Sequence, residues 1–493
     1  MEEENELVAV RKKKLEELRA MGINPYGARY EVRDRAADVH ARYGAHAKDA
    51  LDSERANVKA AGRIVALRGF GKAAFAHIQD ATGRLQIYMK KDVLGEGQYA
   101  LAGLLDIGDH VGVEGRLFRT KTDELTVEVA GLTLLSKSLR PLPEKWHGLT
   151  DVETRYRQRY VDLIVNPEVK RTFIKRNRII KTVREFLDGR SFIEVETPMM
   201  QPIPGGATAR PFVTHHNALD TDLFLRIAPE LYLKRLIVGG FERVYELNRN
   251  FRNEGISIKH NPEFTMLEFY MAYADFKDLM SLTEELISAV AMEAAGGLRI
   301  TYQGDPVDLT PPYPRMTMEE AIATHAGADP SALKDITRAR RLAEEHGVPV
   351  SDDMSLAKVV NEIFEGTTEF KIINPTFITG YPVEISPLSR RNDDDPRFVD
   401  RFELIAAGRE MANAFSELND PIDQKARFME QAAQREKGDQ EAQFMDEDYI
   451  RALEYGMPPT AGEGIGIDRL VMLLTDSASI RDAILFPQLR RER

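Results

Sequence analysis

Two apolar, alternating segments separated by a polar bend constrain the fold of this chain most strongly. Apolar and polar side chains alternate around residues 244–251 and again around residues 264–271. Successive side chains of a strand point to opposite faces, so this pattern predicts a β-hairpin within a sheet. One face of its second strand then combines an aromatic, an acidic and a phenolic group: Phe264, Met266, Glu268 and Tyr270.

Glu268 is the residue of this hairpin that most needs a partner. A carboxylate in so apolar a strand is costly to bury unless a cation or several hydrogen-bond donors meet it. An ion pair within the chain is one explanation, since structural ion pairs outnumber ligand sites. The bend favours a ligand site instead. Arg252 and Phe264 bracket a loop whose Glu254 and His260 suit the phosphates and base edge of a nucleotide.

The bend closely resembles motif 2 of the class II aminoacyl-tRNA synthetases. It reads Phe251-Arg252-Asn253-Glu254-Gly255 and then His260-Asn261-Pro262-Glu263-Phe264, with flanks similar to those of the lysyl enzymes. The resemblance implies ATP as a substrate. It places Arg252 at the amino-acid carboxylate and the α-phosphate, and it places Phe264 against the adenine with Arg469 opposite. A short motif needs support from the rest of the chain.

The bulk properties indicate a soluble, multidomain enzyme, and the resemblance to the class II synthetases implies an α+β fold whose catalytic domain is an antiparallel sheet flanked by helices. A chain of 493 residues is too long for one core, and its net charge of −12 argues against indiscriminate nucleic-acid binding. The absence of cysteine excludes disulfides, a thiolate nucleophile and a cysteine-based zinc site. The acidic N-terminus is followed by no long apolar stretch, so we expect neither a signal peptide nor a membrane span, and a cytoplasmic protein.

Short strands dominate residues 55–137. Five of them with one helix between the third and the fourth predict an OB-fold β-barrel, which binds oligonucleotides on the face of strands 2 and 3. The expected strands are 58–67, 75–79, 85–89, 111–118 and 125–134, with the helix at 99–105. This segment carries 12 Lys+Arg and 9 Asp+Glu, so the relative positive charge lies where RNA is expected.

Three barrel residues are candidates for base recognition. Arg68, Phe75 and Gln86 supply a guanidinium, a stacking ring and an amide. Their spacing resembles the anticodon-binding barrel of the lysyl, aspartyl and asparaginyl enzymes, so the resemblance implies that they read the anticodon. For Phe75 alone, a place in the barrel core is the alternative. Glu124 and His77 are weaker candidates.

The remaining segments complete the expected domain division. Residues 1–54 form an N-terminal helical extension, whose basic run at 11–14 we interpret as a solvated helix face. Residues 138–155 are a linker with two prolines, which favour a semi-rigid connector. Residues 156–493 form the catalytic domain, in which about 275–370 resembles the helical insertion of the family.

Two further segments resemble motifs 1 and 3 of the class. A proline-initiated helix at 167–189, a strand at 192–195 and Thr197-Pro198 look like motif 1, which forms the dimer interface in the family. We therefore expect a homodimer. Residues 462–469 read Gly-Glu-Gly-Ile-Gly-Ile-Asp-Arg, like motif 3. Its glycines let a strand approach a flat ligand, and its Arg469 is expected near the γ-phosphate.

A second hairpin at 401–419 supplies candidate metal and substrate ligands. Glu403 and Glu410 are expected to face each other across the turn and to bind Mg²⁺, which prefers hard oxygen ligands. On the second arm Asn413, Phe415 and Glu417 alternate onto one face. A charged surface hairpin is the alternative, but this arm is too apolar for it.

The charge of the pocket predicts the amino acid. Glu268, Tyr270 and Glu417 suit an extended ammonium, whereas aspartate would need a positive residue and asparagine neutral groups. Lysine is therefore expected, with Glu230 and the Gly206 backbone at its α-amino group. The implied reaction is lysyl-adenylate formation from ATP and transfer to tRNA(Lys). The alternatives are an aspartyl or asparaginyl enzyme, a paralogue with a non-tRNA acceptor, and an RNA-binding module without activity.

Overall fold

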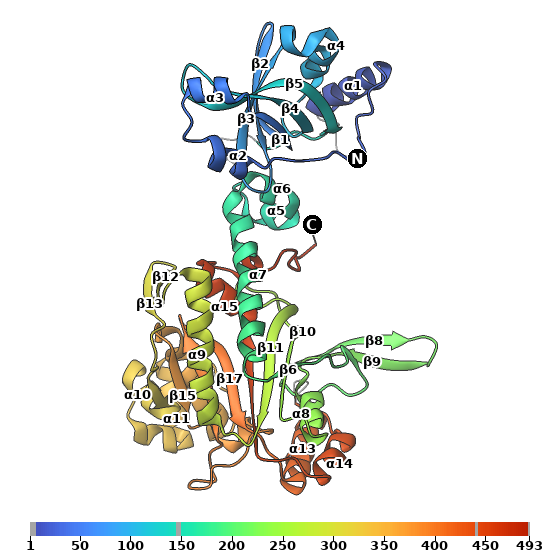
Figure 1. Cartoon of the computed structure of the whole chain (residues 1–493). Helices are drawn as coiled ribbons and strands as arrows, with labels where there is room; N and C mark the ends of the chain where they lie inside the picture. Colours follow the sequence, from blue (N-terminus) through green and yellow to red (C-terminus); the bar gives the residue numbers. More distant parts are fainter. Residues whose placement is uncertain (1–5, 144–148, 439–441, 492–493) are drawn as a thin grey trace. The chain divides into compact units, whose positions relative to one another are not determined.

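The structure is a computed structural model that describes residues 6–143, 149–438 and 442–491. The chain divides into two compact units, Met1–Thr150 and Asp151–Arg493 (Figure 1). The four-part division expected from the sequence stays a prediction, and residues 144–148 of its linker lie outside the described residues. None of the described helices is long and apolar enough to cross a membrane.

The first unit contains the expected OB-fold barrel. Its five strands close in the order β1-β2-β3-β5-β4, with α4 inserted between β3 and β4. The elements are β1 Asn57–Phe70, β2 Ala73–Gln79, β3 Arg84–Lys90, α4 Lys91–Leu104, β4 His110–Arg119 and β5 Leu125–Ser136. Along β2, Ala74, Ala76 and Ile78 are buried while the residues between them are half-buried. The barrel core is therefore built by strand alternation.

Three N-terminal helices pack onto the barrel. They are α1 Glu6–Ala20, α2 Ala36–Tyr43 and α3 Lys48–Glu54. Leu18, Val39 and Leu51 belong to the same buried cluster as the barrel strands. Residues 6–54 and the barrel thus share one hydrophobic core, because neither short helices nor a small barrel buries enough apolar surface alone.

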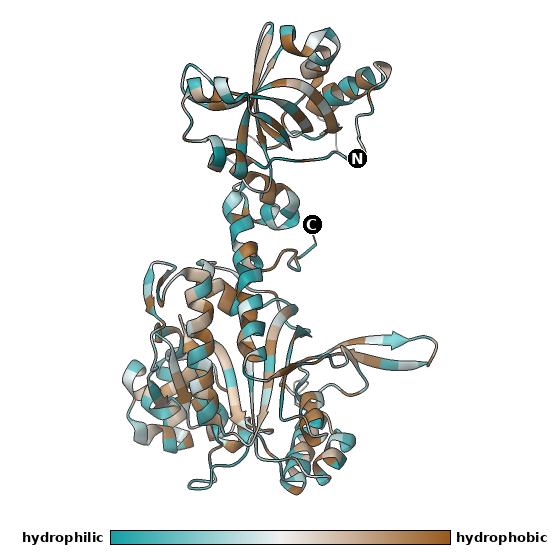
Figure 2. Cartoon of the chain, viewed as in Figure 1, coloured by the Kyte–Doolittle hydropathy of each residue, from teal (hydrophilic) through white to brown (hydrophobic). Residues whose placement is uncertain are grey.

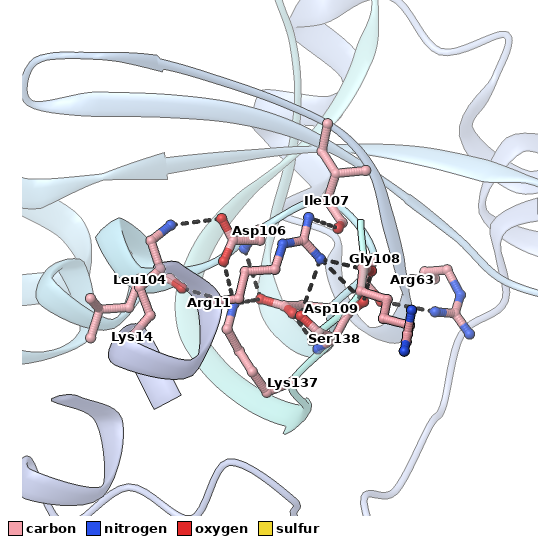
Figure 3. A network of polar contacts seen from close by, with 11 residues as sticks. Arg11, Lys14, Arg63, Leu104, Asp106, Ile107, Gly108, Asp109, Lys137 and Ser138 are labelled. Carbon is pink, nitrogen blue, oxygen red and sulfur yellow. Dashed lines mark hydrogen bonds and ion pairs between the residues drawn. The ribbon is translucent and has the colours of Figure 1, made fainter. Parts of the chain in front are cut away.

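The basic run of α1 is partly an anchor (Figure 3). Arg11 is only 8% exposed and donates to the carbonyl oxygens of Ile107 at 2.9 Å and Ser138 at 3.1 Å. Lys14 donates to Asp106 at 2.6 Å. The interpretation of this run as a solvated helix face is therefore wrong for these two residues, because they donate to partly buried acceptors at the ends of barrel elements.

A buried ion-pair network lies beneath this anchor. The Lys137 ammonium contacts Asp106 at 2.6 Å and Asp109 at 2.8 Å, and it also donates to the Leu104 carbonyl (Figure 3). Asp109 additionally accepts from the backbone N–H of Ser138. Every charge of the network is matched, as buried charges require. The network joins α1, the loop after α4 and the end of β5.

The second unit is built on an eight-stranded, mostly antiparallel sheet. Its strand order is β14-β15-β16-β17-β18-β11-β10-β6. The strands are β6 Ile193–Glu194, β10 Arg243–Phe251, β11 Glu263–Ala272, β14 Arg315–Thr317, β15 Thr376–Thr379, β16 Arg401–Ala406, β17 Arg409–Ser416 and β18 Thr460–Gly466. Smaller sheets pair β7 Met200–Gln201, β8 Phe212–His216 and β9 Thr221–Leu225, and β12 Arg299–Tyr302 with β13 Asp305–Asp308.

Helices cover one face of this sheet. Helices α7 Pro167–Asp188, α9 Phe276–Ala295 and α15 Ile467–Thr475 share the main core with β11, β17 and β18. In Figure 2 the central strands are coloured mainly tan and pale, with interspersed teal segments, and α7 mixes teal and brown residues. The other helices are α5 Val152–Arg157, α6 Arg159–Val165, α8 Glu230–Val238, α10 Met318–Ala326, α11 Ile336–Glu345, α12 Leu356–Thr367, α13 Pro421–Glu436, α14 Glu447–Glu454 and α16 Ile480–Ala483.

The expected helical insertion divides between two cores. Helix α9 belongs to the main core, whereas α10, α11 and α12 form a cluster of their own with Ile378 and Ile405 of the sheet edge. Short 3-10 turns at Pro330–Lys334 and Glu369–Lys371 flank these helices. The insertion therefore packs beside the sheet and leaves its central strands open to other groups.

Strands β10 and β11 form the hairpin predicted around residues 244–271. They pair antiparallel, with Glu246 opposite Glu268 and Leu247 opposite Leu267. Leu267 and Phe269 are fully buried against the helices. The alternate residues of β11 therefore point to the other face of the sheet, as the sequence pattern predicts.

Candidate active site

Two adjoining cavities lie on the open face of the sheet. The larger has a volume of about 310 Å³ and the smaller of about 100 Å³. They share four lining residues, Arg252, Met266, Glu410 and Gly464. A ligand with two chemically different ends fits such a pair, and Arg252 lies where the ends meet.

The cavities collect nearly all residues that the sequence singled out. The larger is lined by Gly206, Glu230, Arg252, Glu268, Tyr270, Glu403, Glu410, Asn413 and Phe415. The smaller is lined by Arg252, Glu254, His260, Phe264, Glu410 and Arg469. Among the residues expected at the amino-acid, ATP and metal sites, Glu417 is the exception, because it lines neither cavity.

Glu268 is a buried acid without an ion pair among the described residues. It is 6% exposed, and its one hydrogen bond comes from the Tyr270 hydroxyl at 3.4 Å. Burial, with the repulsion of Glu230 and Glu246, raises the pKa of Glu268 to about 8, against the attraction of Arg252. Within the described part of the chain, the alternative considered from the sequence, an ion pair to Glu268, is not found. Glu268 therefore offers its charge to a ligand.

Glu230 and Glu417 both contact Lys234, a residue that was not predicted from the sequence. The ammonium of Lys234 lies 2.5 Å from Glu230 and also contacts Glu417. All three side chains are at most 8% exposed. Burial alone would lower the pKa of Lys234, but Glu230 and Glu417 outweigh it and raise that pKa. Lys234 is therefore a permanent cation behind the cavity.

Glu403 and Glu410 do not lie directly opposite each other, contrary to expectation. Glu403 pairs with Asn413, and Glu410 pairs with Ile405, because the register skips Met411. This β-bulge shifts the alternation of β17 by one residue. Without it Glu410 and Asn413, three residues apart, would point to opposite faces. The bulge brings Glu410 to the side of Glu403, so both line the larger cavity.

Each of these two carboxylates has an arginine partner. Arg401 contacts Glu403 at 2.6 Å, and Arg469 contacts Glu410 at 3.0 Å. Burial and the neighbouring Glu410 raise the pKa of Glu403 to about 7, although Arg401 opposes the shift. The pKa of Glu410 is lowered, since Arg469 outweighs burial. The pair keeps partial negative charge at neutral pH.

The smaller cavity combines a ring with a guanidinium. Arg252 lies over the Phe264 ring at 5.1 Å, the geometry of a cation–π contact. The Nε atom of Arg252 is buried and has no hydrogen-bond partner in the described structure. A buried donor of this kind is a candidate for a ligand oxygen. The expected stacking of adenine between Phe264 and Arg469 stays a prediction.

Gly462 and Gly464 of β18 line the larger cavity. A Cβ atom at Gly462 would collide with the Glu417 carboxylate and the Tyr270 ring, and at Gly464 it would lie 3.0 Å from Met266. Any side chain at Gly462 would therefore displace Glu417 and Tyr270. This close approach explains the alternating glycines of the third sequence motif.

Asp468, an aspartate of the third motif, connects α7 to β11. Asp468 contacts Arg176 of α7 at 2.5 Å and accepts from the Thr265 backbone at 2.7 Å. Arg176 also donates to the Thr265 hydroxyl at 2.9 Å. The three motifs recognised in the sequence thus meet beside the cavities, which fixes β11 relative to α7 and α15.

A separate cavity of about 630 Å³ lies on the barrel of the first unit. It is lined by Arg68, Phe75 and Gln86, together with Glu124 and His77. Phe75 points outward beside the Tyr88 ring at 4.5 Å, so the alternative of a core residue is wrong. Gln86 donates to Glu124 at 2.5 Å, and His77 also contacts Glu124.

Two of the site residues that were not predicted, Lys234 and Arg401, have a spacing in the sequence that indicates their partners. Lys234 follows Glu230 by four positions in a helix, the spacing of a helical ion pair. Arg401 precedes Glu403 by two positions in a strand, so both side chains share a face. Met266, which lines both cavities, carries no polar group that would have marked it.

Comparisons with known proteins agree with this geometry. Residues 151–490 match the family model of the class II tRNA synthetases (D, K and N), and residues 58–135 match the OB-fold nucleic acid binding domain. The lysine–tRNA ligase of Pelotomaculum thermopropionicum is 61% identical over 99% of this chain and 96% of its own length. Those of Carboxydothermus hydrogenoformans and Moorella thermoacetica are 60% and 59% identical, each over 99% of both chains. The chain belongs to the lysine–tRNA ligase family of the class II tRNA synthetases.

Proposed function

We propose that this chain activates L-lysine with ATP to lysyl-adenylate and transfers the lysyl group to the 3′ end of tRNA(Lys). The single observation that carries the proposal is Glu268, a buried acid that forms no ion pair with any residue that the structure describes, in a cavity that Arg252 also lines. A ligand that brings an ammonium to one and a carboxylate to the other satisfies both. The lysine–tRNA ligases similar to this chain support the same assignment.

The pocket charges favour lysine over its nearest rivals. Glu268 and Tyr270 meet the side-chain ammonium, and Glu230 with the Gly206 backbone holds the α-amino group. An aspartate side chain in the same place would meet like charge, and asparagine would leave the carboxylate unpaired. The aspartyl and asparaginyl alternatives are disfavoured on this ground.

Activation requires positioning and charge neutralisation. The lysine carboxylate attacks the α-phosphorus of ATP, a bond forms between them, and diphosphate leaves with the electrons of the broken P–O bond. Arg252 neutralises the carboxylate and the α-phosphate, while Arg469 and His260 face the outer phosphates. Phe264 stacks on the adenine, and Glu254 meets its edge. No side chain of the protein forms a covalent bond.

Glu403 and Glu410 fit Mg²⁺ that accompanies ATP. The described residues contain no group of three or more His, Asp or Glu side chains placed to hold a metal. A pair of carboxylates suits this ion, because Mg²⁺ takes its other ligands from phosphates and water. When bound, the metal neutralises phosphate charge. Arg401 and Arg469 hold the two carboxylates in place for it.

The second step uses the tRNA. The 3′-terminal hydroxyl attacks the adenylate carbonyl, the lysyl ester forms, and AMP leaves with the electrons of the broken C–O bond. Arg68, Phe75 and Gln86 on the barrel contact the anticodon, since a ring, a guanidinium and an amide together suit an unstacked base. A homodimer through the segment around α7 completes the proposed assembly.

Amino-acid-dependent exchange between ATP and diphosphate tests the proposal. Each of the twenty amino acids is supplied in turn, and the full chain should exchange with lysine at least 100-fold faster than with aspartate or asparagine, as expected from an unpaired buried charge costing about 3 kcal/mol. Exchange with aspartate or asparagine but not lysine would overturn the assignment of the pocket.

A further inference from the structure

Two buried acids, Glu230 and Glu268, line the larger cavity, and one lysine joins Glu230 to a third buried acid, Glu417. Lys234 contacts Glu230 at the start of α8 and Glu417 just after β17. Its side chain is fully buried, and its ammonium lies 5.3 Å from the Phe415 ring. Lys234 does not line the cavity, whereas Glu230 and Phe415 do. Lys234 therefore acts on the cavity through its neighbours.

Several ionisable groups surround Lys234 and its two partners. The ionisable groups that face Lys234 and its partners are Glu230, Glu268, Glu417, Tyr270, Tyr449, Arg235 and Arg401. Burial raises the pKa of Tyr270 and of Tyr449, so both phenols stay neutral near pH 7. Burial also raises the pKa of Glu230, Glu268 and Glu417, whereas Lys234 opposes the rise for Glu230 and Glu417. The ammonium groups of a bound lysine would favour the ionised form of these acids further.

We propose that Lys234 is a positioning residue for amino-acid selection: it keeps Glu230 and Glu417 charged and in place, so that the cavity presents the charge that lysine requires. The inference rests on the proposed function. Without Lys234, three like charges would crowd one buried space, and protonation would relieve them. The cavity would then lose the negative charge that attracts the substrate.

Two substitutions separate charge from hydrogen bonding. Lys234→Met retains an unbranched chain without the charge, and Lys234→Gln retains N–H donors without the charge. Lys334→Met is the matched control, because Lys334 forms an exposed pair with Glu319 at 3.7 Å. Exchange between ATP and diphosphate gives KM for lysine and for ATP, and thermal unfolding reports whether each variant folds.

Both charge-removing variants should raise KM for lysine about 100-fold, as expected when a buried ion pair loses one partner, and leave KM for ATP within about threefold. Relative to wild type, the defect should shrink between about pH 6.5 and 8.5, because the freed acids regain charge. If Lys234→Met does not fold, the KM values of Lys234→Gln alone test the proposal.

Three results would overturn the proposal. These are an unchanged KM for lysine in Lys234→Gln, equal losses for lysine and ATP, and a defect independent of pH. Each would assign Lys234 a purely structural role. Failure of the proposed function gives a different result, because the wild-type chain itself would then show no lysine-dependent exchange.

Discussion

Replacing Glu268 by glutamine removes one charge from the amino-acid cavity and almost no volume. Breaking a buried ion pair costs about 3–5 kcal/mol. In the free protein the pKa of Glu268 is about 8, so at pH 7 the carboxyl must first lose a proton when lysine binds. That step costs about 1.4 kcal/mol, which leaves a net loss of roughly 2–4 kcal/mol. We therefore expect kcat/KM for lysine to fall about 30- to 1000-fold.

The assay measures kcat/KM for lysine and KM for ATP in exchange with diphosphate. KM for ATP should change less than about threefold. Glu268 does not line the smaller cavity, so the contacts that bind ATP there stay intact. Glu263→Gln is the matched control, since Glu263 is exposed at the start of the same strand. Equal losses for lysine and ATP would refute the reasoning and make Glu268 a structural acid.

Glu268→Gln should stabilise the folded protein, although it lowers kcat/KM for lysine. The pKa of Glu268 rises from 4.5 to about 8 on folding, so the folded state binds more protons than the unfolded state between these values. Its contribution to stability is present below pH 4.5 and is lost as the pH rises through 8. Urea unfolding should thus show Glu268→Gln gaining stability relative to wild type from pH 5 to 8.5. A constant difference would contradict the raised pKa.

Three more predictions concern other parts of the chain. Asp109→Asn removes the fully buried one of the two carboxylates that contact Lys137 and should destabilise the first unit by about 3 kcal/mol, measured by urea unfolding, whereas an unchanged midpoint would contradict the network. Glu403→Gln should raise the Mg²⁺ concentration for half-maximal exchange at least about tenfold, and an unchanged requirement would remove Glu403 from the metal site. Phe75→Ala should weaken discrimination among tRNA anticodon variants, with the exposed Tyr455→Ala as control, and intact discrimination would count against the stacking role.

Local patterns in the sequence were sufficient for much of the fold and most of the candidate site. The OB-fold barrel and the paired strands β10 and β11 follow from alternation with period two, which also placed Met266, Glu268 and Tyr270 on one face. The resemblance of two motifs to those of the class II synthetases added Arg252 and Arg469. These features are readable because each depends on residues close together in the chain.

Features that depend on register or on distant partners were not predicted. The bulge at Met411 is set by how β16 and β17 align, and no local residue type announces it. Lys234 has a local partner in Glu230, but its contact with Glu417 arises only when α8 meets the end of β17. Arg11 and Lys14 looked like a solvated run because their acceptors lie in the barrel.

Aminoacylation measures the central claim most directly. Purified chain is incubated with ATP, Mg²⁺, labelled lysine and either tRNA(Lys) or tRNA(Asp), and acid-stable label on the tRNA is counted. The structure predicts lysine attached to tRNA(Lys), with AMP formed in equal amount, and no label on tRNA(Asp). Lysyl-adenylate formation without label on any tRNA would contradict the account and favour a paralogue with another acceptor.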